Sequence, residues 1–179
     1  MKIYTRTGDM GRTDLADGER VAKDTVRVDA IGTLDELNSV LGMVRCEALP
    51  EGLDEVLRHL QEELFLAGGE LASPRAEPRI GKKHVLYLET EIDRLGESLE
   101  PLEEFLLPAG CRATAELHLA RTVCRRAERR GVALAHTDEE SVSPDLLAYL
   151  NRLADLLFTL ARAANRHAGR EEVARESRP

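Results

Sequence analysis

Apolar residues recur along this chain at alternating spacings of four and three residues, the pattern of a helix that buries one stripe. The first stripe predicts a helix over 26–48, which Pro50 ends, and the second predicts a helix over 52–72. A third stripe predicts a helix over 83–99, followed by Pro101. No segment alternates convincingly between single apolar and polar residues, so we expect no strand.

Two further stripes complete the pattern. The fourth extends from Ala113 to Leu134. The fifth begins after Ser143, a favourable N-cap that is followed by Pro144 at the first helical position. Five amphipathic segments with short connections predict an all-α fold, a five-helix antiparallel bundle of the ferritin-like kind.

With 179 residues, the chain has room for one domain with a substantial core. We divide it into an N-terminal segment, 1–25, which belongs to the same domain, the bundle, 26–168, and a charged tail, 169–179, expected to be disordered. The net charge of −8 argues against binding to nucleic acid or to an anionic membrane.

The fourth stripe is basic although the whole chain is acidic. Residues 111–130 contain six Arg and two acidic residues. Arg121, Arg125 and Glu128 each follow a stripe residue by one position, which places them at the edge of the buried face. This arrangement indicates a site for a small anionic ligand. The alternative is a solvated face with intrahelical ion pairs.

Polar residues occupy the same edge in two other helices. They are Asp35 and Asn38 in the first helix and Asn151 and Asp155 in the last. Phe105, in the apolar connector before the basic helix, is a candidate ligand contact, and its alternative role is that of a core plug.

The N-terminal segment is rich in Gly, Thr and charged residues, and Lys23 lies near its end. Glycine permits backbone conformations in which successive N–H groups converge on an anion, so this segment is a candidate phosphate site. It lacks the P-loop spacing of glycines and lysine. The alternative is a merely mobile terminus.

The remaining chemistry is sparse. Cys46, Cys111 and Cys124 form no C-x-x-C pair, which favours a reducing cytoplasm over a disulfide scaffold or a zinc site. No signal peptide and no apolar run near 18 residues occurs. No His follows a Glu by three positions, and Glu55 with His59 is more typical of a surface contact, so we expect no protein-ligated metal.

Several stretches in order together resemble one family, the PduO-type ATP:cob(I)alamin adenosyltransferases. The similarity covers nearly the whole chain except the tail. The stretches that carry it are Tyr-Thr-Arg-Thr-Gly-Asp-Met-Gly from Tyr4, Gly-Thr-Leu-Asp-Glu-Leu-Asn from Gly32, Phe-Leu-Leu-Pro from Phe105, Ala-Arg-Thr-Val-Cys-Arg-Arg-Ala-Glu-Arg from Ala120, and Tyr-Leu-Asn-Arg-Leu-Ala-Asp-Leu-Leu-Phe from Tyr149.

The resemblance implies a homotrimer with active sites between subunits and transfer of the 5′-deoxyadenosyl group from ATP to cob(I)alamin, which releases triphosphate. It implies catalytic roles for Phe105, which would displace the lower axial ligand of the corrinoid, for Arg125, and for Asp35 and Arg121, which would pair across neighbouring subunits. The positions that it assigns to ATP are Thr5, Arg6, Thr7, Gly8, Thr13, Lys23, Arg125, Arg126, Glu128, Arg129 and Asn151.

The same resemblance implies Mg²⁺ held mainly by the phosphates, and it brings in two candidate partners, a flavin reductase and an adenosylcobalamin-dependent mutase. Two residues depart from the family pattern: Met10 stands where Lys is frequent, and Ala109 where Gly is usual after Leu-Pro. A competing hypothesis is a helical carrier or regulatory module that binds nucleotide or cobalamin without chemistry.

Overall fold

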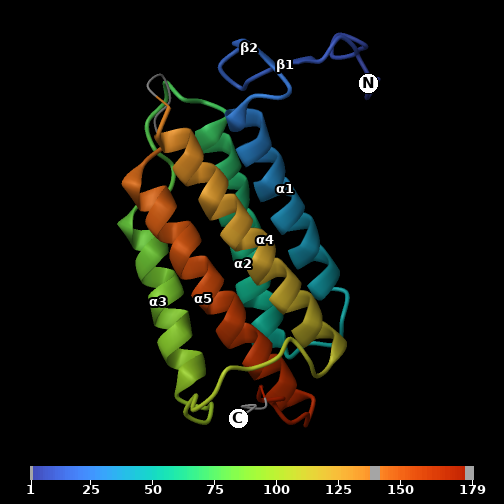
Figure 1. Cartoon of the computed structure of the whole chain (residues 1–179), viewed down its shortest axis with the longest axis vertical. Coiled ribbons are helices and arrows are strands. Elements are labelled where there is room, and N and C mark those ends of the chain that lie inside the picture. The colour runs from blue at the N-terminus through green and yellow to red at the C-terminus, as the bar shows by residue number, and fades with distance from the viewer. Residues whose placement is uncertain (1, 138–141, 176–179) are drawn as a thin grey trace.

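Five helices alternate in direction along the long axis of the molecule (Figure 1). The computed structural model describes residues 2–137 and 142–175. The helices are α1 Val26–Val44, α2 Glu51–Leu71, α3 Lys82–Gly96, α4 Arg112–Ala135 and α5 Pro144–His167. The predicted five-helix bundle is therefore confirmed.

The core lies along the predicted stripes. α4 lies between α1 and α5, while α2 packs on α1 and α3 on α5. In α4 and α5 every stripe residue is buried, including Ala120 and Leu157. α3 is less enclosed: Val85 and Ile92 are only half-buried, because this helix covers one side of the bundle.

Two helices end earlier than their stripes predict. α1 ends at Val44, so residues 45–48 lie outside it, and the Arg45 guanidinium there pairs with Asp54 of α2 at 2.6 Å. α3 ends at Gly96 and closes with tight backbone turns that reach Leu99. In both cases the Pro follows the helix end by several residues: Pro50 is the N-cap of α2, whereas Pro101 lies in the connector before α4.

The expectation of no strand was wrong for the N-terminal segment. Strands β1 Arg12–Asp14 and β2 Arg20–Ala22 form an antiparallel hairpin, in which Thr13 lies opposite Val21. A turn at Gly18, with φ of +86°, reverses the chain between them. Both faces of so short a hairpin are largely exposed, so its sequence carries no apolar alternation.

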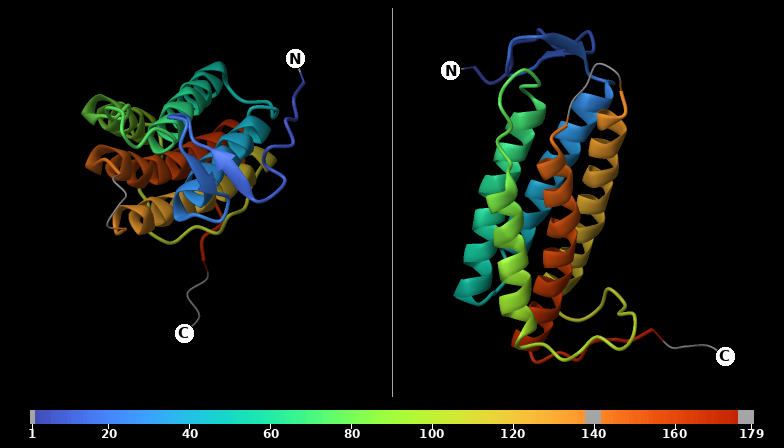
Figure 2. Two further views of the ribbon diagram at one scale, coloured as in Figure 1. Left: turned by 90° about the horizontal axis from the view of Figure 1, so that it is seen from above. Right: turned by 90° about the vertical axis from the view of Figure 1, so that its left-hand side faces the viewer.

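The hairpin lies across the end of the bundle where α1 begins (Figure 2). Its turn region is attached to the loop after α2: the Ala16 amide donates to the Ala72 carbonyl at 2.9 Å, and Arg75 pairs with Glu19 at 2.8 Å. The residues before β1 extend away from the bundle, and Ile3 and Met10 are almost fully exposed.

The structure also differs from the expected disordered tail over residues 169–175. Here the chain crosses the connector between α3 and α4, and Ala174 forms an isolated antiparallel bridge with Leu106. The Arg162 side chain on α5 pairs with Glu172 at 2.6 Å. The charged Glu172 side chain of this segment therefore contacts the bundle. Residues 176–179 lie outside the described residues.

Candidate functional site at the groove between α4 and α5

The arginines of α4 separate onto two edges of the helix. Toward α1, Arg126 pairs with Glu36, and Arg130 pairs with Asp29 at 2.7 Å. These four side chains are about half exposed, so their ion pairs contribute little to stability. They tie two neighbouring helices together and leave little of the positive charge uncompensated on this edge.

Toward α5, the arginines have no acidic partner. Arg121 and Arg125 border a pocket of about 370 Å³, and in the described parts of the chain neither forms an ion pair. The Nε atom of Arg121 is buried without a hydrogen-bond partner, which is costly unless something outside the chain completes it. The pocket is lined by Leu102, Phe105, Leu106, Arg121, Arg125, Ala154, Asp155, Phe158 and Thr159.

The connector between α3 and α4 places Phe105 in this pocket. Asn165 on α5 holds the end of the connector: its amide donates to the Ala109 carbonyl at 3.1 Å, and its carbonyl accepts from the Cys111 amide at 3.0 Å. Gly110 has φ of +131°, and a Cβ there would lie 2.0 Å from Asn165, so only glycine fits.

Phe105 itself is 82% exposed. The alternative that it plugs the core is therefore wrong. An exposed aromatic ring beside two arginines that form no ion pair in the described residues gives a site with one apolar wall and one cationic wall. Such a site suits a large ligand that is apolar at one end and anionic at the other.

Two further predicted positions lie one turn along α4 and on the facing part of α5. There the Asn151 amide donates to the Glu128 carboxylate at 2.9 Å, so two predicted ATP positions are in contact. Arg129 is exposed and makes no ion pair within the described residues. Two other edge residues have structural partners: Asp155 pairs with Arg152 at 2.8 Å, and Asn38 exchanges hydrogen bonds with Gln61.

The predicted N-terminal positions form a second cluster. The Lys23 ammonium lies 3.1 Å from where a Cβ on Gly8 would stand, so Gly8 makes room for it. Thr13 lies on β1, and the hydroxyls of Thr5 and Thr7 are hydrogen-bonded at 2.8 Å. Arg6 between them has φ of +63°, an uncommon conformation for a residue with a side chain.

Within one chain these two clusters stay apart. The N-terminal segment lies at one end of the bundle, and the connector lies at the other (Figure 1). Asp35 is exposed on α1 and forms no ion pair with Arg121 of the same chain. One chain therefore does not assemble all the predicted residues into a single site.

Two buried titratable groups border the arginines. Burial lowers the pKa of His118, and the charge of nearby Arg121 lowers it further, so its imidazole is held neutral. Burial raises the pKa of the Cys124 thiol, which donates to the Leu150 carbonyl. Neither group adds charge to the groove, whose charged lining residues are Arg121, Arg125 and Asp155, and Asp155 pairs with Arg152.

Sequence reasoning missed Phe158 and Leu102 as apolar walls of the pocket. Phe158 carried a usable signal, because it is one of only three Phe and lies three residues after Asp155 on the same edge. Leu102 carried none, because it belongs to an irregular connector whose path depends on tertiary contacts.

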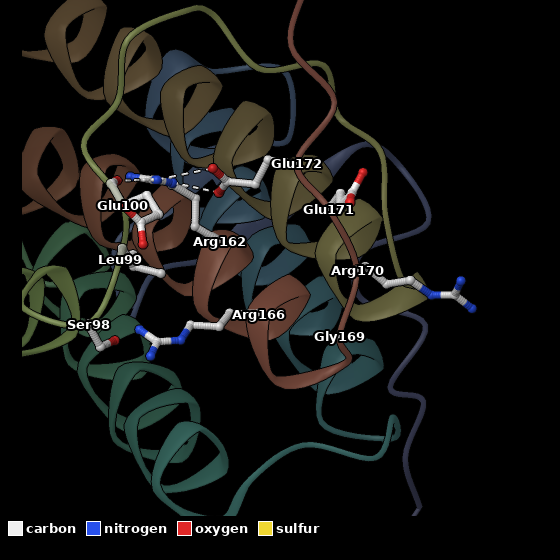
Figure 3. Close-up of a pocket in the computed structure, with 9 residues that line it drawn as sticks. All are labelled: Ser98, Leu99, Glu100, Arg162, Arg166, Gly169, Arg170, Glu171 and Glu172. Carbon is white, nitrogen blue, oxygen red and sulfur yellow. Dashed lines mark hydrogen bonds and ion pairs between the residues drawn. The ribbon is translucent and has the colours of Figure 1, made fainter.

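A second hollow of about 450 Å³ lies at the foot of α5, under the C-terminal segment (Figure 3). Among the described residues, no group of three or more His, Cys, Asp or Glu is arranged to hold a metal ion. Across the same ranges, every helix is too short or too polar to span a lipid bilayer.

Fold and groove define a helical-bundle protein with an arginine-lined site for an anionic ligand. A family model described as cobalamin adenosyltransferase matches residues 3–164, and the chain belongs to this family. It is 45% identical to the corrinoid adenosyltransferase PduO of Salmonella typhimurium over 98% of this chain, although it spans only 53% of that relative's length. It is 46% identical to the cobalamin adenosyltransferase of Cupriavidus metallidurans, over 96% and 92% of the two chains.

A solved structure supports the same assignment. A variant PduO-type ATP:corrinoid adenosyltransferase from Lactobacillus reuteri, complexed with cobalamin and ATP, superimposes with a TM-score of 0.93. It is 33% identical and is matched over 98% of this chain and 97% of its own. The predicted family and fold are confirmed.

Proposed function

We propose that this protein is a corrinoid adenosyltransferase that transfers the 5′-deoxyadenosyl group of ATP to cob(I)alamin. The cobalt supplies the electron pair that forms the Co–C5′ bond, and the C5′–O bond breaks with its electrons passing to triphosphate. Cobalt is thereby oxidised from Co(I) to Co(III), and the products are adenosylcobalamin and triphosphate. No protein nucleophile is needed, so the chain's residues bind, orient and stabilise charge.

The observation that carries this proposal is the pocket in which Phe105 lies with Arg121 and Arg125. We assign the corrinoid to the apolar wall, with Phe105 against its lower face in place of the axial base. We assign the leaving triphosphate to the cationic wall, where Arg125 donates charge-assisted hydrogen bonds as negative charge develops.

The remaining predicted positions complete the ATP site in this proposal. On α4 and α5 they are Arg126, Glu128, Arg129 and Asn151, and the Glu128–Asn151 contact supports a shared role. In the N-terminal segment they are Thr5, Arg6, Thr7, Gly8, Thr13 and Lys23, and the closeness of Lys23 to Gly8 supports a phosphate site there.

We further propose that Mg²⁺ accompanies ATP and is bound mainly by phosphate oxygens. Mg²⁺ retains several waters and needs only one or two protein carboxylates when phosphates are present. Glu128 is the acidic member of the proposed ATP positions, and its carboxylate already accepts from Asn151. It orients that amide in this proposal, and the phosphates supply the metal ligands.

A homotrimer with the active site between subunits accounts for the separation of the two clusters. The N-terminal segment extends away from its own bundle with Ile3 and Met10 exposed, as expected for an arm that packs on a neighbour. Asp35 of one subunit would then pair with Arg121 of the next, whose Nε has no hydrogen-bond partner among the described residues.

We propose a cytoplasmic location, supported by three free cysteines, of which Cys46 is exposed. The substrate must be reduced to Co(I) before transfer, so a flavin reductase is a suitable upstream partner. An adenosylcobalamin-dependent mutase is a suitable consumer of the product.

The test is anaerobic incubation of the protein with MgATP and chemically reduced cobalamin, followed by the absorption change that marks adenosylcobalamin. We expect stoichiometric triphosphate release alongside Co–C bond formation. Binding of both ligands without either product would favour the non-catalytic carrier and overturn this proposal.

A further inference from the structure

The carbonyl and amide groups around Phe105 are held by the C-terminal segment. The Leu107 amide donates to the Val173 carbonyl, and the Arg175 amide donates to the Phe105 carbonyl, both at 2.8 Å. Because the Phe105 side chain is 82% exposed, packing does little to fix its position. Its place in the pocket therefore depends on where this segment lies.

Within the described residues, Arg162 is the one helix side chain that pairs with this segment. Arg162 on α5 pairs with both carboxylate oxygens of Glu172, at 2.6 and 3.0 Å, and donates to the Glu100 carbonyl at 2.7 Å. Its side chain is only 10% exposed, and that of Glu172 is 28% exposed. A two-point pair with little water around it is stronger and more directional than an ordinary surface pair.

Over residues 169–172 the segment borders a hollow lined mainly by polar and charged side chains, with Leu99 as its one apolar lining residue. The hollow of about 450 Å³ at the foot of α5 lies between residues 98–100 and 169–172 (Figure 3). In Figure 3 the Glu172 carboxylate turns toward Arg162, while Glu171 points away from it. The ion pair thus bridges a gap that no packed side chain fills.

We infer that Arg162 is a positioning residue for the corrinoid site: through Glu172 it holds residues 171–175 against the connector and so fixes the backbone of Phe105. This inference rests on the proposed function. It predicts that the pair controls how well Phe105 excludes the axial base, and that it contributes little to folding of the bundle, whose core lies above it.

The chain offers a matched control one residue away. Glu172→Gln removes the paired charge, and Glu171→Gln removes the same charge from an exposed neighbour that forms no ion pair within the described residues. Arg162→Gln and Arg166→Gln form a second such comparison, because Arg166 lines the same hollow and forms no ion pair in the described parts of the chain.

The first measurement is backbone amide exchange in the whole protein without substrates. In Glu172→Gln and Arg162→Gln, the Leu107 and Arg175 amides should exchange about tenfold faster, because the segment opens locally. Exchange in α4 and the thermal midpoint should match the wild type. Both controls should retain wild-type exchange at all these sites.

The second measurement compares turnover of cobalamin with that of cobinamide, which lacks the nucleotide-loop base. Glu172→Gln should slow the reaction with cobalamin about tenfold and leave cobinamide within about twofold, because a displaced Phe105 matters only when a base must be excluded. A purely structural role would slow both substrates equally.

The outcomes separate the two ideas. A wild-type protein that converts neither corrinoid overturns the proposed function, and the positioning role with it. An active wild type, with Glu172→Gln indistinguishable from Glu171→Gln in exchange or in the cobalamin-to-cobinamide ratio, overturns the positioning role alone.

Discussion

The two edges of α4 carry the same residue type but differ in what surrounds it. Toward α1, Arg126 and Arg130 meet Glu36 and Asp29. Toward α5, Arg121 and Arg125 border a largely apolar pocket that Phe105 also lines, and neither pairs with Asp155 in its lining. Arg125 on one edge and Arg130 on the other are both exposed, so exposure alone does not distinguish the edges.

What distinguishes them is whether the charge is already compensated within the chain. A paired guanidinium has spent much of its directional hydrogen-bonding capacity, whereas an unpaired one beside a low-dielectric wall attracts an anion strongly. The number of arginines on a helix is therefore a poor indicator of a binding site. Their pairing with the neighbouring helix is the informative property. Arg126, which the proposed ATP site includes, would therefore have to exchange Glu36 for a phosphate.

The largest effect is expected on the α5 edge. Arg125→Ala should lower the catalytic rate by about 10- to 150-fold, the equivalent of about 1.5–3 kcal/mol for one lost charge-assisted contact to the leaving triphosphate. The thermal midpoint should not change, because Arg125 is exposed and makes no ion pair in the described residues. Steady-state turnover with saturating cob(I)alamin, with calorimetry alongside, measures both. A folded variant within twofold of the wild type would place Arg125 among ordinary surface residues.

Phe105→Ala tests the opposite wall of the same pocket. We expect a loss of about tenfold or more with cobalamin and a much smaller loss with cobinamide, because only cobalamin brings an axial base to exclude. ATP affinity, measured by calorimetric titration, should hardly change. The exposed side chain makes a large stability loss unexpected. Equal losses on both corrinoids would remove Phe105 from the reaction.

Asp35→Ala tests whether Asp35 of one subunit forms an ion pair with Arg121 of its neighbour. The change should weaken trimer association by about 1–3 kcal/mol, because it leaves the partly buried guanidinium without its acceptor. Sedimentation equilibrium over a range of concentrations gives the association constant. The exchanged pair, Asp35→Arg with Arg121→Asp, should recover part of the loss. An association constant that is unchanged in Asp35→Arg alone and in Arg121→Asp alone would show that the two residues do not meet.

The smallest effect is expected on the α1 edge. Arg130→Ala should change the free energy of unfolding by about 0.5 kcal/mol or less, because its pair with Asp29 is half exposed. Turnover should remain within about twofold of the wild type. Chemical denaturation and the same turnover assay serve as the control for Arg125→Ala. If Arg130→Ala were as damaging as Arg125→Ala, pairing would not be what separates the two edges.

The sequence determined the helices and the residues at their edges. Apolar stripes such as the one from Ala113 to Leu134 report a local periodicity, and Ser143 with Pro144 sets a helix start without help from the rest of the fold. The edge position of Arg121 and Arg125 follows from that periodicity alone. These features depend on residues within a few turns of one another, which is why the linear pattern suffices.

Only the tertiary structure decided which arginines are paired, where the connector runs and how the ends of the chain are used. The Arg126 pair with Glu36 joins residues 90 positions apart, and the bridge between Leu106 and Ala174 joins two irregular segments with no periodic signal. The β1–β2 hairpin is likewise held by a turn and by the loop after α2. Such contacts form because folding brings distant segments together, and no spacing along the chain records that approach.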